Sequence, residues 1–190
     1  MDRKAVAAAR TEFGRAKQSL ADLAASNDFA AVERHWAAFL VSAGRVFTKL
    51  EQGSKTNNKS KGWWSRILGT RRSDPLLCYI WHARHADEHG IESVTQQYPG
   101  YASVVEPTPE EKRAFEEAMR AETRPYVPLG MVEWLPPHLR LVDVVNYDQR
   151  YSVPLSHLGT AITNPSPHNV GSLAMTYLEQ IVSEADALST

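Results

Sequence analysis

The stretch FAAVERHWAAFLVSAGRVFTKL, residues 29–50, decides the fold of this chain. Its apolar residues recur in steps of three and four, which is the spacing of one face of an α-helix. Asp28 immediately precedes the stretch and is a residue type that caps helix N-termini. The stretch therefore predicts a long helix whose apolar stripe contains Phe29, Val32, Trp36, Phe39, Ala43, Val46 and Leu50.

A second stripe with the same spacing lies just before it, between about Arg3 and Ala25. Two long amphipathic helices joined by a few residues indicate an antiparallel helical hairpin. The members of this first stripe are Val6, Ala9, Phe13, Ala16, Leu20 and Leu23.

Residues 51–74, EQGSKTNNKSKGWWSRILGTRRSD, have the composition of a loop. Basic residues interleaved with aromatic ones can hold phosphates and stack on bases, which indicates nucleic-acid binding. The alternative is a solvated loop whose tryptophans fold back onto the helices. The candidate binding residues are Lys55, Lys59, Lys61, Trp63, Trp64, Arg66, Arg71 and Arg72.

Residues 74–91, DPLLCYIWHARHADEHGI, predict a third helix. Asp74 can cap its start, and Pro75 suits the first helical position, where no N–H is needed. Gly90 favours an end there, since glycine enters the left-handed conformation at low cost.

The region from about residue 96 to 165 predicts an insertion of mixed structure. Residues 96–106 read as irregular, and a capped helix follows from Thr108 to near Arg124. LRLVDVV (139–145) and RYSVPL (150–155) flank NYDQ, which predicts a β-hairpin, and residues 126–134 are a possible third strand.

Ser166 and Pro167 begin a last amphipathic helix, to about residue 188. We therefore predict a single mainly α domain over residues 1–190, a four- to five-helix bundle. The bundle comprises residues 1–95 and 166–188, and the small antiparallel β insertion before the C-terminal helix spans about 96–165.

The third helix carries three of the seven histidines and the only cysteine. His82, His85 and His89 lie near one face and could bind a metal, although a tetrahedral site needs further ligands. Alternatively, they are polar residues at a bundle surface without chemistry. Cys78 is expected to be a buried, inert thiol rather than a nucleophile. His138 and His157 are expected to fasten loops.

The segment RHADEH, residues 84–89, resembles the Arg-polar-x-x-x-His pattern of the HEPN superfamily, the higher eukaryotes and prokaryotes nucleotide-binding domains. The wider helix also resembles a group of bacterial proteins without an assigned activity. The superfamily resemblance covers the helical residues, mainly 1–95 and to a lesser extent 166–188. It implies a small helical bundle, often dimeric, that binds RNA or nucleotides and can be a metal-independent ribonuclease.

On this resemblance Arg84, His85 and His89 would be the catalytic residues. The histidine would take the proton of the ribose 2′-hydroxyl, and the arginine would stabilise charge on the phosphorus. Arg84 and His89 point about 140° apart on a straight helix, so a shared site favours a homodimer with its third helices face to face. Asp87 and Glu88 favour the non-catalytic alternative, because carboxylates repel a phosphate backbone.

Charge is unevenly distributed along the chain. Residues 1–95 contain 15 lysines and arginines against 10 acidic residues, whereas residues 96–190 contain 6 against 12. The basic half could face a polyanion, or the two halves could attract each other. No run of apolar residues predicts a membrane span, and a single cysteine is typical of a cytoplasmic protein.

These observations rank three functions. The first is a HEPN-like protein that binds RNA or a nucleotide, that could also act as a metal-independent ribonuclease, and that needs no cofactor. The second is a non-catalytic helical interaction protein with an unknown protein partner. The third is a metal-dependent hydrolase using the three histidines.

Overall fold

The structure, a computed structural model, describes residues 1–89, 93–104, 107–121 and 132–189. The chain divides into two compact units, residues 1–96 with 139–190, and residues 97–138. The first, which we call the helical unit, contains five of the six helices found in the described residues. The predicted mainly α class, with small antiparallel strand pairs before the C-terminal helix, is confirmed.

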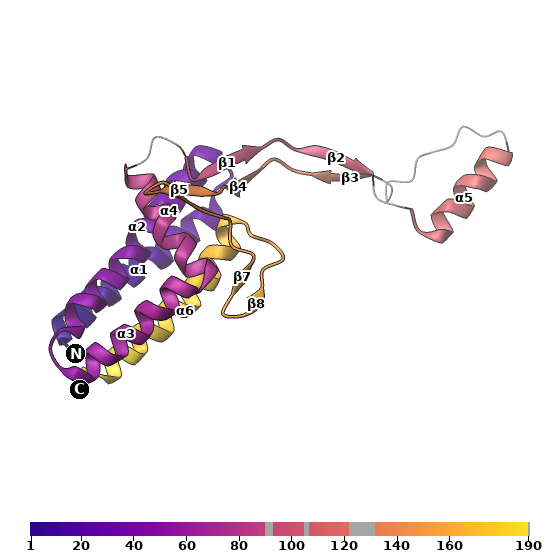
Figure 1. The fold of residues 1–190 in the computed structure, drawn as a ribbon. Coiled ribbons are helices and arrows are strands. Elements are labelled where there is room, and N and C mark those ends of the chain that lie inside the picture. Colours follow the sequence, from indigo (N-terminus) through magenta and orange to yellow (C-terminus); the bar gives the residue numbers. More distant parts are fainter. Residues whose placement is uncertain (90–92, 105–106, 122–131, 190) are drawn as a thin grey trace. The chain divides into compact units, whose positions relative to one another are not determined.

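The helical hairpin predicted from the two long stripes is present (Figure 1). Helix α1 spans Arg3–Ala25 and helix α2 spans Phe29–Ser54. Asp28 caps α2 as predicted, since its carboxylate accepts a hydrogen bond from the Ala31 N–H at 2.9 Å. The stripe residues of α2 from Trp36 to Leu50 are buried in the core.

The loop prediction for residues 51–74 was wrong, because most of this segment is helical. Helix α3 spans Asn58–Ser73, and Asn57 caps it by accepting from the Ser60 N–H. The buried positions Trp63, Ile67 and Arg71 are spaced four residues apart and form one helical face. The dense lysines, arginines and glycines around them conceal this stripe in the sequence.

Helix α4 spans Pro75–His89, and Asp74 caps it by accepting from the Leu77 N–H, as predicted. The predicted stop at Gly90 lies outside the described residues. Helix α6 spans Pro167–Ala187 and begins at the predicted Ser166 cap. Its Gly171 lies against Leu20 of α1 and Trp36 of α2, so the last helix docks into the bundle.

Two short hairpins precede α6. In the first, β5 (Val144–Asn146) pairs with β6 (Gln149–Tyr151), which confirms the predicted hairpin around NYDQ. Tyr147 and Asp148 both have positive φ, 52° and 59°, as a type I′ turn requires. In the second hairpin, β7 (Ser156–His157) pairs with β8 (Thr160–Ala161).

Residues 97–138 form the second unit. In this unit strand β2 (Tyr101–Val104) pairs antiparallel with β3 (Val132–Leu135). Strands β1 (Thr95–Tyr98) and β4 (His138–Leu141), which pair with each other, each contain residues of both units. The prediction that residues 96–106 are irregular was therefore wrong for the two strands. Helix α5 (Pro109–Arg120) has the predicted capping box at Thr108 and exposes most of its surface. Most of the possible strand at 126–134 lies outside the described residues.

A polar junction joins α3 to α6. Glu184 accepts hydrogen bonds from Trp63 Nε1 and Arg66 Nη2, both at 2.8 Å, and from Gln180 Nε2 at 2.9 Å. Partial burial raises the pKa of Glu184, but the three hydrogen bonds outweigh burial and hold the pKa below its ordinary value.

This junction predicts an acid-dependent loss of stability. Because the folded pKa of Glu184 is depressed, its contribution is present above the ordinary pKa and is lost as the pH falls through the lower folded value. We expect Glu184→Gln to lower stability at pH 7 and to flatten the decline below a pH of about 4.5. Urea denaturation across pH would measure this. Glu179→Gln on the same helix is the control, and an equal flattening by both variants would contradict the assignment.

Candidate functional site

His82 of α4 lies against the β5–β6 hairpin. Its ring stacks on Tyr151, with centroids 3.6 Å apart and planes 8° from parallel. The side-chain amide of Asn146 lies 2.9 Å from Nδ1 and donates to it, so Nε2 carries the hydrogen of the neutral ring. Burial, together with the nearby His85 and Arg71, lowers the pKa of His82. The ring is therefore neutral near pH 7 and can donate a hydrogen bond from Nε2.

Arg84 lies on a different face of α4, against α2. A methyl group at Gly44 would approach Arg84 Cδ to 2.5 Å and Nη1 to 2.9 Å, so the arginine fills the space that this glycine leaves. The stem and guanidinium of Arg84 therefore pack against helix α2. His85 meets the edge of Trp81, with ring centroids 5.1 Å apart. The side chain of His89, and with it the predicted Arg84–His89 pair, lies outside the described part of the chain.

Arg71, from the last turn of α3, is a buried cation of the helical unit. Its residue surface is only 8% exposed, and its guanidinium lies 3.7 Å from the centroid of the Trp81 ring and 5.5 Å from that of Phe47. Within the described residues it forms no ion pair or hydrogen bond with the protein. Burial and the neighbouring Arg72 lower its pKa, but an arginine keeps its charge at neutral pH.

The arginine lines a pocket of about 390 Å³, which we call the Arg71 pocket. Helices α3 and α4 form one wall, and the β5–β6 hairpin supplies the other. No carboxylate is present in its lining, so the charge is positive. The lining residues are Arg71, Arg72, Cys78, Trp81, His82, Gln149 and Tyr151.

A neighbouring hollow of about 380 Å³ shares two lining residues, Cys78 and Tyr151, with the Arg71 pocket. The two hollows therefore adjoin along the face of α4. Burial raises the pKa of the Cys78 thiol, and the charge of Arg71 offsets this only in part. The thiol is protonated at neutral pH, so Cys78 is not an activated nucleophile.

The structure divides the eight residues predicted to bind nucleic acid. Arg71 and Arg72 line the pocket, whereas Arg66 pairs with Glu184 at 2.8 Å. Trp63 and Trp64 are 9% and 7% exposed, so their rings pack in the core and offer no open face for base stacking. Their burial counts against a role in base stacking, which stays a prediction. The remaining three, which are exposed around the start of α3, are Lys55, Lys59 and Lys61.

Asn146, Gln149 and Tyr151 join the site although the sequence did not single them out. Asn146 lies 64 residues after its partner His82 in the sequence, and no local pattern predicts a contact over that distance. One signal in the sequence did point to this site. Arg71 follows Ile67 by four residues, so on a helix it lies on the same buried face, where a cation is unusual.

A second polar cluster lies at the start of α4. Asp74 Oδ1 accepts from His157 Nδ1 and from the Leu77 N–H, both at 2.9 Å, and Oδ2 accepts from the Leu158 N–H at 2.6 Å. The side chains of Asp74 and His157 are 4% and 10% exposed. His157 therefore fastens the β7–β8 hairpin to α4.

In the described part of the chain, no three or more His, Cys, Asp or Glu side chains are grouped so that they could hold a metal ion. The predicted trio of His82, His85 and His89 includes a side chain, that of His89, outside the described part of the chain. No helix within the described ranges is both long enough and apolar enough to cross a membrane.

No protein-family model matches the chain, and comparisons with curated proteins and with solved structures give no significant match.

Proposed function

We propose that this protein binds RNA or a nucleotide, and that the Arg71 pocket receives a phosphate group. The observation that carries the proposal is the buried guanidinium of Arg71, which lacks a carboxylate partner among the described residues. A buried cation is costly unless an anion or several acceptors compensate it. Trp81 compensates in part through its ring face, which leaves the N–H groups of the guanidinium for a ligand.

The other lining groups suit a phosphate. Arg72 adds a second cation to the lining. The Nε2–H of neutral His82 adds a hydrogen-bond donor, and the group that orients this ring is the amide of Asn146, not a carboxylate that would repel phosphate. Arginine binds phosphate oxygens through two parallel hydrogen bonds, which gives geometric selectivity as well as attraction. The net positive charge of residues 1–95 would draw a polyanion towards this unit. The resemblance to HEPN proteins points to the same ligand class.

The test is a comparison of two arginine substitutions on α3. Arg71→Met keeps a long apolar stem against Trp81 but removes the charge, whereas Arg66→Met removes a cation that pairs with Glu184 outside the pocket. We expect Arg71→Met to weaken binding of a labelled single-stranded oligoribonucleotide at least about tenfold, because charged hydrogen bonds contribute about 1.5–3 kcal/mol. Fluorescence anisotropy at several salt concentrations would measure the affinity.

We expect Arg66→Met to change the affinity by less than about threefold, which is the effect of one distant surface charge. Inorganic phosphate should compete with the RNA in the wild-type protein. Equal losses in the two variants would contradict a phosphate site at Arg71, as would RNA binding that phosphate does not affect.

Ribonuclease activity through Arg84, His85 and His89 stays a prediction of the resemblance, as does the face-to-face homodimer. The same RNA, incubated with the protein and a chelator and then run on a denaturing gel, reports cleavage directly. If the RNA stays intact although it binds, the protein is an RNA-binding protein without nuclease activity. If RNA does not bind, the non-catalytic interaction protein becomes the leading function.

A further inference from the structure

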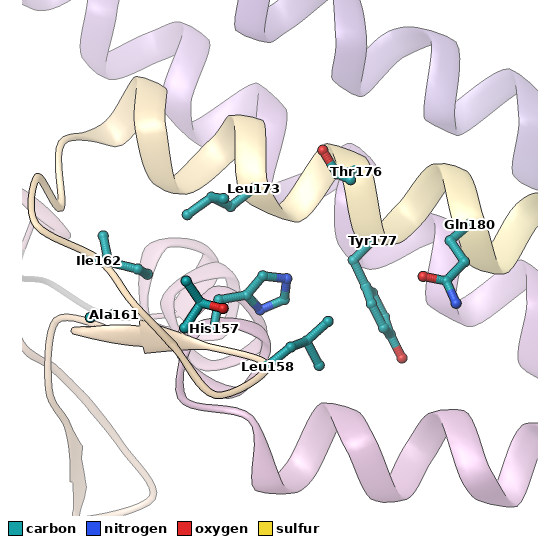
Figure 2. A pocket seen from close by; sticks show the side chains of 9 residues that line it. His157, Leu158, Ala161, Ile162, Leu173, Thr176, Tyr177 and Gln180 are labelled. Atoms are coloured by element: carbon teal, nitrogen blue, oxygen red, sulfur yellow. The ribbon is translucent and has the colours of Figure 1, made fainter.

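A separate pocket of about 270 Å³ lies between the β7–β8 hairpin and α6 (Figure 2). It shares no lining residue with the Arg71 pocket. Four aliphatic side chains and the ring of Tyr177 make most of its surface apolar. The complete lining is His157, Leu158, Thr160, Ala161, Ile162, Leu173, Thr176, Tyr177 and Gln180.

His157 is the buried polar group of this pocket. Figure 2 shows its ring extending from β7 towards α6, between Leu158 and Leu173. The ring meets Tyr177 edge to face, with centroids 6.1 Å apart and planes at 83°. These neighbours hold the imidazole in one orientation at the pocket wall.

Asp74 determines which ring nitrogen is available to a ligand. A carboxylate only accepts hydrogen bonds, so the 2.9 Å contact places the hydrogen of the neutral ring on Nδ1. The carboxylate is itself fixed by the backbone N–H groups of Leu77 and Leu158. Nε2 then carries a lone pair, and no group in the described ranges hydrogen-bonds to it. This is a pre-oriented acceptor at the wall of an apolar pocket.

Two polar side chains of the lining, Thr176 and Gln180, already have hydrogen-bond partners. Thr176 donates its hydroxyl hydrogen to the Ser172 carbonyl at 3.2 Å, and the Gln180 amide donates to Glu184 at 2.9 Å. His157 Nε2 is therefore a pre-oriented acceptor beside the aliphatic side chains, and the buried Tyr177 hydroxyl, which has no hydrogen-bond partner in the described part of the chain, is another open polar group of the lining. An engineered apolar cavity of about 150 Å³ accepts benzene, so 270 Å³ has room for a fused bicyclic ring.

We propose that this pocket binds a small, largely apolar organic molecule that carries one hydroxyl or N–H group. The ligand places its rings against Leu158, Ile162 and Leu173, and donates its single hydrogen to His157 Nε2. Burial of the apolar rings supplies most of the affinity, and the hydrogen bond orients the ligand. The site is independent of the phosphate site proposed above.

Indole and 1-methylindole are the probes, because the second lacks the N–H group and otherwise closely matches the first. Isothermal titration of the wild-type protein should give about threefold to tenfold tighter binding of indole, the effect of one buried hydrogen bond. His157→Phe should remove this preference while apolar binding persists. Leu173→Trp should weaken both ligands, because the larger side chain occupies the pocket.

Nitrogen-15 NMR of imidazole-labelled wild-type protein tests the same contact without a substitution. Indole should shift the His157 Nε2 resonance, and 1-methylindole should leave it almost unchanged. Arg71→Met should keep the indole preference, which separates this proposal from the phosphate site. Absence of indole binding overturns the proposal, as does equal affinity for the two probes, a preference that survives His157→Phe, or binding that Leu173→Trp leaves intact.

Discussion

Replacing Trp36 with alanine is expected to lower the free energy of unfolding by about 3–5 kcal/mol, the range for large aromatic deletions in a core. Trp36 is 0% exposed and stacks on Phe39, with ring centroids 5.2 Å apart. A methyl group at Gly171 would lie 3.5 Å from its ring, so the indole packs where α6 meets α2. Alanine would leave a cavity at this contact, and helix backbones cannot close it fully. Urea denaturation followed by circular dichroism measures the loss.

Trp36→Phe is the matched control. Phenylalanine keeps most of the buried ring area, and it also removes the indole Nε1, a buried atom without a hydrogen-bond partner in the described part of the chain. The cost of this substitution should therefore stay below about 1.5 kcal/mol. A loss of less than about 1 kcal/mol for Trp36→Ala would contradict the central packing role assigned to this residue.

Replacing Asp74 with alanine should have an effect of similar size, about 3–5 kcal/mol, as expected when one member of a buried polar pair is removed. The substitution removes the cap of α4 and the acceptor of His157 together. It leaves His157 Nδ1 and the N–H groups of Leu77 and Leu158 without their acceptor. Urea denaturation measures the total loss of stability.

Asp28→Ala isolates the capping contribution. Asp28 caps α2 through a single exposed hydrogen bond to Ala31, so its loss should cost only about 0.5–2 kcal/mol. The difference between the two alanine variants then measures how strongly Asp74 holds the β7–β8 hairpin. Equal losses would mean that the contact with His157 adds no stability.

The helices with regular apolar stripes and N-terminal caps could be predicted from sequence. Asp28, Asp74, Thr108 and Ser166 each stand at a cap in the structure. Helix α3 could not be predicted in this way, because lysines, arginines and two glycines, which are individually typical of loops, separate its buried residues. Strands β1 and β2 were missed for a different reason. Short paired strands depend on distant partners, and residues 95–104 carry no clear alternation.

The candidate site was predictable only in part. Arg71 and Arg72 from the basic segment and His82 from the predicted third helix line one pocket, and whether this pocket is functional stays a prediction. The sequence could not show that Trp63 and Trp64 are buried, nor that Arg84 packs on Gly44. Such outcomes depend on how α3 and α4 rotate against α2, which tertiary packing decides.

The two walls of the Arg71 pocket come from elements that contribute differently to the stability of the bundle. Its cations stand on α3, which packs within the bundle, whereas Gln149 and Tyr151 belong to a hairpin closed by a two-residue turn. Gln149 is exposed and is not a member of the hydrophobic core, and its side chain accepts a hydrogen bond from the Tyr151 hydroxyl at 3.0 Å. If the Arg71 pocket binds the proposed phosphate, a library randomised at this position should retune anion preference while the helical core is kept.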